Sequence, residues 1–141
     1  MAITGFDHVV LLVEDLDEGI RTWRDQLGIP LSHKVELPDT GIAQAFFSLS
    51  DGTFIELVAP LGEDSPVTER LVNRGEGMHV LSLSVDDLDG TVASMERQGA
   101  RLIGAGTPRV MVHPESSGGV LIQLWPEDRP HRWRDGEDRV S

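Results

Sequence analysis

Three polar side chains stand inside strand-like runs that are otherwise apolar, and they are the first candidates for chemistry in this chain. They are His8 in residues 7–13, Glu56 in residues 52–57 and Gln123 in residues 119–124. Imidazole and carboxylate groups are common general acids and bases in proteins. The chain has no cysteine, so disulfides, thiolate zinc sites, iron–sulfur clusters and cysteine nucleophiles are excluded.

The sequence contains an internal repeat that must position these side chains. An offset of 72 residues (87 − 15) carries Asp15-Leu16-Asp17 onto Asp87-Leu88-Asp89, and residues 52–57 correspond to 119–124. Each half reads as a strand, a helix and further strands, because apolar runs alternate with clusters of Gly, Asp, Pro and Ser. The aspartates can cap the two helices, which predicts where each helix begins.

We therefore predict an α+β fold of two tandem βαβββ modules in a single domain over residues 1–126. Module one covers about residues 3–62 and module two about residues 76–126. Residues 127–141 are polar and mixed in charge, which predicts a C-terminal tail that is extended or partly ordered.

The charge of the chain limits its partners. Asp and Glu number 24 against 12 Lys and Arg, a formal net charge of −12. Such a surface repels phosphate backbones and anionic lipids, so we expect neither nucleic-acid nor membrane partners. No apolar run reaches the length of a membrane span, and the first residues lack the pattern of a signal peptide. The expected location is the cytoplasm.

Several segments, in this order and at this spacing, resemble a known superfamily. They are Asp7-His8-Val9, residues 54–61, residues 64–67, Gly75-Glu76-Gly77-Met78-His79, residues 85–88 and residues 113–122. The chain resembles the vicinal oxygen chelate superfamily (glyoxalase I, extradiol dioxygenases, bleomycin-binding proteins), and within it the methylmalonyl-CoA epimerases. The resemblance implies that the modules form an open, curled mixed β-sheet around a central cavity.

The resemblance also implies a divalent metal ion (Co, Ni, Mn or Zn) held by four positions in that cavity. Carried over, these positions are His8, Glu56, residue 80 and Gln123. The epimerases have two successive histidines where this chain has His79-Val80, and the second histidine binds the metal. His8, Glu56 and Gln123 remain as metal ligands, so we expect the metal site to be weakened or lost.

Strand alternation tests whether His79 can replace the missing ligand. Side chains at i and i+2 share a face, so Val80 faces the cavity with Ser82 and Ser84, and His79 points away as a structural histidine. A β-bulge at this place would instead rotate His79 inward. The substrate-binding residues predicted from alternation and from the family loop are Gln44, Phe46, Val80, Ser82, Ser84, Trp125, His113 and Ser116.

The resemblance implies an isomerase or lyase that acts by acid–base enolisation on a small carbonyl, carboxylate or acyl-thioester compound. The epimerases place carboxylate bases where this chain has Gln44 and Gln123, so Glu56 and His8 become the catalytic candidates. Burial among apolar side chains raises the proton affinity of a carboxylate. Glu56 and His8 can also simply satisfy each other as a buried pair.

Two further functions stay open at this point. One is a metal-free small-molecule binding protein for sequestration or resistance, and the other is an acid–base enzyme that needs no metal. The candidate contacts for the phosphates of an acyl-CoA are Arg70, Arg74, Arg109 and Lys34. Each of them can instead be an ordinary solvated surface charge. Relatives are commonly dimers, so a homodimer is expected by analogy.

Overall fold

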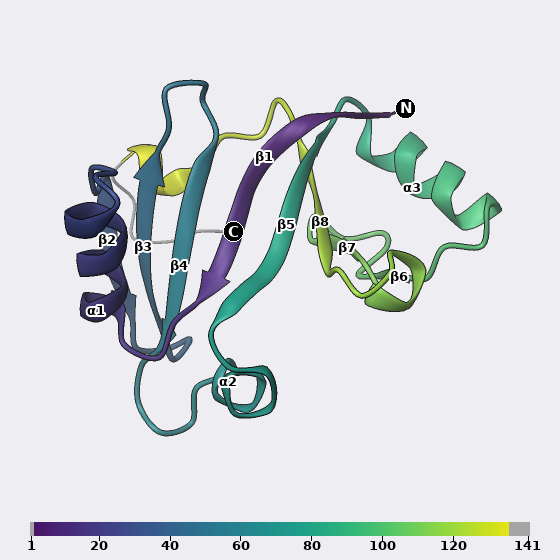
Figure 1. The fold of residues 1–141 in the computed structure, drawn as a ribbon. Coiled ribbons are helices and arrows are strands. Elements are labelled where there is room, and N and C mark those ends of the chain that lie inside the picture. Colours follow the sequence, from purple (N-terminus) through teal and green to yellow (C-terminus); the bar gives the residue numbers. More distant parts are fainter. Residues whose placement is uncertain (1, 136–141) are drawn as a thin grey trace.

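The computed structural model describes residues 2–135, and it contains one open sheet of eight strands (Figure 1). The strands are β1 (Ile3–Leu12), β2 (His33–Leu37), β3 (Ile42–Ser48), β4 (Phe54–Pro60), β5 (Gly77–Val85), β6 (Leu102–Ile103), β7 (Val110–Val112) and β8 (Ile122–Pro126). The helical segments are α1 (Leu16–Ile20), the π-helical η1 (Arg21–Gln26), α2 (Thr68–Arg74), α3 (Leu88–Arg97) and the 3₁₀ turns η2 (Pro114–Ser116) and η3 (Arg132–Asp135).

The order of the strands reproduces the predicted duplication. The sheet runs β2-β3-β4-β1-β5-β8-β7-β6. The second half has the same strand order as the first, read in the opposite direction from the β1–β5 pair. β1 pairs in parallel with β4, β5 pairs in parallel with β8, and the antiparallel β1–β5 pair joins the two halves. The predicted fold class, two βαβββ modules in an open mixed sheet, is confirmed; the exact domain bounds stay a prediction.

The main helix of each half covers the outer face of its own strands. Asp15 caps α1 by accepting a hydrogen bond from the Glu18 amide at 3.0 Å, and Asp87 caps α3 through the Gly90 amide at 3.1 Å. α1 packs on residues of β3 and β4, and α3 packs on β5, β7 and β8. The inner face of the sheet therefore remains available for a cavity.

The β1–β5 ladder has three register shifts, one between Ile3 and Gly5 and two closer to the cavity residues. Phe6 pairs with Leu83 and His8 with Ser82, which leaves Asp7 as the extra residue. Farther along, Val10 pairs with Val80 and Leu11 with Met78, which leaves His79 as the extra residue. Residues 7 and 79 differ by the repeat offset of 72 (79 − 7). The same irregularity thus occurs at the same place in both halves, and a bulge re-aims the side chains beside it.

The chain after β8 folds back over the inner face of module one. Trp133 in η3 is only 4% exposed and packs with Val35, Phe46 and Phe54. Figure 1 shows this yellow segment beside β3 and β4, away from the strand it follows. Within the predicted tail, Trp133 anchors a segment whose other residues are largely exposed, and residues 136–141 lie outside the described residues. No helix within residues 2–135 is long and apolar enough to cross a membrane.

Candidate functional site

A cavity of about 380 Å³ lies on the inner face of the sheet. Both modules contribute to its wall, as the duplicated fold requires. The candidate residues on the wall are His8, Gln44, Glu56, Val80 and Gln123, and His79, Arg109 and Met111 join them. A mixed apolar and polar wall of this kind is typical of small-molecule sites.

Glu56 contributes a buried carboxyl group to the wall of this cavity. Its side chain accepts a hydrogen bond from Gln44 Nε2 at 3.0 Å, and its Oε1 atom lies 3.9 Å from His8 Nε2. The second distance is too long for a hydrogen bond, so Glu56 and His8 do not satisfy each other directly. Burial raises the pKa of Glu56 to about 7, although the bond from Gln44 acts in the opposite direction. A carboxyl group with this pKa can accept and release a proton near neutral pH.

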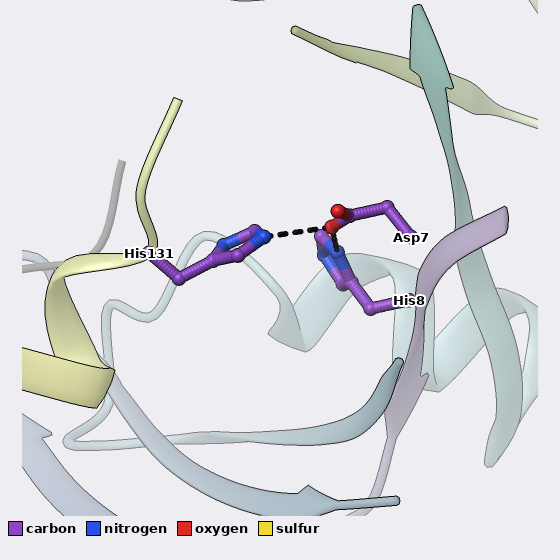
Figure 2. A group of neighbouring side chains, drawn as sticks. All are labelled: Asp7, His8 and His131. Carbon is purple, nitrogen blue, oxygen red and sulfur yellow. Dashed lines mark hydrogen bonds and ion pairs between the residues drawn. The ribbon is translucent and has the colours of Figure 1, made fainter. Parts of the chain in front are cut away.

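The carboxylate of Asp7 fixes the orientation of the His8 ring. Asp7 Oδ2 lies 2.6 Å from His8 Nδ1, and His131 Nε2 lies 2.8 Å from the same oxygen (Figure 2). Burial alone would raise the pKa of Asp7, but the hydrogen bonds from His131 and His8 lower it to about 2. Burial lowers the pKa of His8 against the opposing effect of Asp7. A neutral His8 therefore donates its Nδ1 proton to Asp7 and turns the Nε2 lone pair toward Glu56.

The C-terminal segment completes this arrangement. The ring of His131 stacks on Trp125 with centroids 4.1 Å apart and lies 4.7 Å from Phe54. Asp7 and His131 were not among the site residues predicted from the sequence. The signal for His131 was present, because His131 and Trp133 stand close together in an otherwise polar stretch.

His79 lies on the cavity wall, so the outward orientation expected from strict alternation is wrong. The cause is the bulge in β5, which puts His79 out of step with the ladder. Its Nδ1 atom is buried and has no hydrogen-bond partner among the described residues. Burial, helped by the charge of Arg70, lowers the pKa of His79 to about 4. The imidazole is neutral at physiological pH.

The other predicted substrate contacts lie off the cavity wall. Phe46 and Trp125 are covered by the C-terminal segment, because Trp133 stacks on Phe46 at 4.6 Å and His131 on Trp125. Ser82 is fully buried opposite His8. His113 and Ser116 belong to the η2 turn, where His113 accepts a bond from the Glu115 amide and Ser116 from the Arg101 amide. Ser84, one register step beyond Ser82, is half-buried and does not line the cavity.

The possible ligand atoms on the cavity wall would bind a cation only weakly. His8 Nε2 and Glu56 Oε1 face each other at 3.9 Å, and the Asp7–His8 bond is the kind of support that metal-bound histidines have. Gln123 adds a neutral amide, and Val80 adds no donor. Such a set suits an ion that keeps several waters. The ligand atoms of Asp7, His8 and His131 also lie within 4.8 Å of one another (Figure 2), but one Asp7 oxygen faces both rings, as in a hydrogen-bonded triad.

Known proteins are similar to this chain in both sequence and fold. The mouse mitochondrial methylmalonyl-CoA epimerase is 37% identical over 126 residues, covering 84% of this chain and 70% of that protein. An ethylmalonyl-CoA/methylmalonyl-CoA epimerase of Cereibacter sphaeroides is 32% identical, covering 86% of this chain and 97% of the relative. The crystal structure of the Mycobacterium tuberculosis methylmalonyl-CoA epimerase superimposes with a TM-score of 0.75 at 37% identity, covering 91% and 90% of the two chains.

A further solved structure shows such an enzyme with its substrate. A methylmalonyl-CoA epimerase in complex with methylmalonyl-CoA and NH4+ matches with a TM-score of 0.74 at 26% identity, covering 90% of this chain and 97% of that one. The model of the glyoxalase/bleomycin resistance protein/dioxygenase superfamily matches residues 7–113. This chain therefore belongs to the glyoxalase/bleomycin resistance protein/dioxygenase superfamily, and the relatives compared above are epimerases of acyl-CoA thioesters.

Proposed function

We propose that this protein is an isomerase that inverts the carbon next to the carbonyl of an acyl-CoA thioester such as methylmalonyl-CoA. The observation that carries the proposal is Glu56, a buried carboxyl group in the cavity whose pKa is about 7. The names of the relatives support the substrate class. Removal of a proton next to a carbonyl needs such a base, and enolate formation needs an electrophilic or hydrogen-bonding partner for the oxygen.

The reaction begins when the Glu56 carboxylate accepts the proton from the carbon between the thioester and the substrate carboxylate. The electron pair of the broken C–H bond moves onto the thioester oxygen, which becomes an enolate. Gln44 holds Glu56 in place through the bond to Oε2. Asp7 and His131 hold His8 so that its Nε2 atom stays aimed into the cavity.

Inversion requires that the proton return to the opposite face of the enolate. The register places Glu56 of β4 and Val80 of β5 on either side of Val10 in β1. His79 stands next to Val80 on the same cavity wall. A planar enolate bound above Val10 therefore faces Glu56 on one side and His79 on the other. We assign the removal step to Glu56. His79 is neutral at physiological pH, so we assign it the orientation of a water molecule that gives a proton to the opposite face; the hydroxide left behind is neutralised when Glu56 releases its proton to solvent.

A divalent ion held by His8, Glu56 and Gln123 would supply Lewis-acid stabilisation of the enolate oxygen. The identity of that ion, a homodimer and a cytoplasmic location remain predictions. Metal analysis of the purified protein, and activity before and after chelation and re-addition of Co²⁺, separate a metal-assisted enzyme from an acid–base enzyme that needs no metal.

The experiment that tests the proposal is exchange of the α-proton of methylmalonyl-CoA in D₂O, followed by NMR. The wild-type protein should catalyse exchange, and Glu56→Gln should slow it by about 10²–10⁴-fold, the usual contribution of a general base. Glu63→Gln, which changes an exposed carboxylate, is the matched control and should exchange normally. Binding of methylmalonyl-CoA without any exchange would instead favour the binding-protein alternative, and full activity of Glu56→Gln would remove Glu56 from the mechanism.

A further inference from the structure

A second pocket, of about 480 Å³, adjoins the catalytic cavity. Its wall is formed by the turn at Thr107-Pro108-Arg109 and by the segment that follows β8, which contributes Arg129, Pro130 and Arg132. Arg109 lines both this pocket and the catalytic cavity. The two spaces are therefore neighbours with a shared arginine between them.

The concentration of arginine here is unusual for this protein. The chain has a net charge of −12 and only 12 Lys and Arg residues in all, yet three of them surround one pocket. The planar guanidinium group matches the geometry of phosphate oxygens and can bind them through two parallel hydrogen bonds. An arginine cluster in an acidic protein is thus a local electrostatic target for a phosphorylated ligand.

One of these arginines is held in place. Arg129 Nη1 donates a hydrogen bond to the Pro108 carbonyl at 2.9 Å, and the guanidinium group lies 5.0 Å from the centroid of the Trp125 ring. The Trp125 Nε1–H donates to the Arg129 carbonyl at 2.9 Å. These contacts tie the turn before β7 to the C-terminal segment and reduce the entropy that Arg129 loses when it binds an anion.

We propose that this arginine pocket binds the phosphate groups of the coenzyme A portion of the substrate. The inference rests on the proposed function. An acyl-CoA is larger than the drug-sized ligands that a cavity of about 380 Å³ encloses. When the acyl group lies beside Glu56, the phosphate-bearing end must pass the rim, and Arg109 leads from that rim into the second pocket.

The test compares a substrate that carries the phosphates with one that lacks them. Michaelis constants are measured for methylmalonyl-CoA and for methylmalonyl-pantetheine with wild type, Arg132→Glu and Arg129→Gln. Each substitution should raise the constant for the CoA thioester about tenfold or more, the size of a charge-assisted hydrogen bond, and leave the pantetheine thioester unchanged. Arg132 is exposed, so its variant should fold even if Arg129→Gln is destabilised. Arg101→Gln, an exposed arginine paired with Glu115, is the control.

Calorimetric titration with free coenzyme A separates this proposal from the proposed reaction. Weaker CoA binding by Arg132→Glu, with wild-type affinity in Arg101→Gln, supports the arginine site even if no thioester is turned over. Equal CoA affinity in wild type and both arginine variants overturns it, whether or not the enzyme is an epimerase. Equal losses on both thioesters also overturn it, because the arginines would then act on the fold or the acyl end.

Discussion

Replacing Glu56 with Gln should stabilise the metal-free protein above neutral pH, although it removes the proposed base. The pKa of the Glu56 carboxyl is about 7 in the folded protein against an ordinary value of 4.5. Between pH 4.5 and pH 7 the folded protein keeps a proton on Glu56 that the unfolded chain has lost. The free energy of unfolding therefore falls as the pH rises through this range. One pKa step is worth about 1.4 kcal/mol, so the carboxylate costs about 3 kcal/mol above pH 7, and Gln avoids this cost.

Urea unfolding in the presence of a chelator measures the effect, with pH steps from about 4 to 9. The free energy of unfolding of Glu56→Gln should match that of wild type at the acid end. It should then rise above the wild-type value between about pH 4.5 and pH 7, the two pKa values of the carboxyl group, and exceed it by about 3 kcal/mol at the alkaline end. Glu63→Gln should show no such divergence, because its side chain meets water in both states. Parallel curves for Glu56→Gln and wild type would refute the buried, protonatable carboxyl group and with it the base assignment.

Three other perturbations test the surroundings of the site. Asp7→Asn should lower the free energy of unfolding by about 2 kcal/mol near neutrality. Because the pKa of Asp7 is lowered to about 2, this deficit should shrink as the pH falls from about 4 toward 2. A deficit that stays constant would contradict the stabilisation of the Asp7 carboxylate by His8 and His131. Trp133→Ala should cost about 3 kcal/mol in thermal unfolding, whereas Trp23→Phe, at a partly exposed position, should cost less. Val80→His should tighten Co²⁺ binding about tenfold or more in spectroscopic titration; unchanged affinity would mean that position 80 does not face the ion.

The sequence was sufficient for the features that depend on local pattern. The duplication, the caps at Asp15 and Asp87 and the alternation that puts His8 and Glu56 on one face all follow from short stretches of residues. His79 was misplaced because a bulge depends on how two distant strands pair, and neither strand alone encodes the extra residue. His131 was missed because its partners, Asp7 and Trp125, belong to strands of different modules, and only the folded sheet brings them together.

The return of the C-terminal segment onto module one also constrains how the protein is made. Phe46 and Phe54 belong to the first half of the chain, but the ring that covers them is Trp133. During synthesis on the ribosome, these aromatic side chains emerge long before their cover does. The first half must therefore wait, with an apolar face open to other nascent chains, until residue 133 has left the ribosomal tunnel. Chaperone dependence and aggregation during synthesis should accordingly respond more to a stop codon before Trp133 than to one after η3.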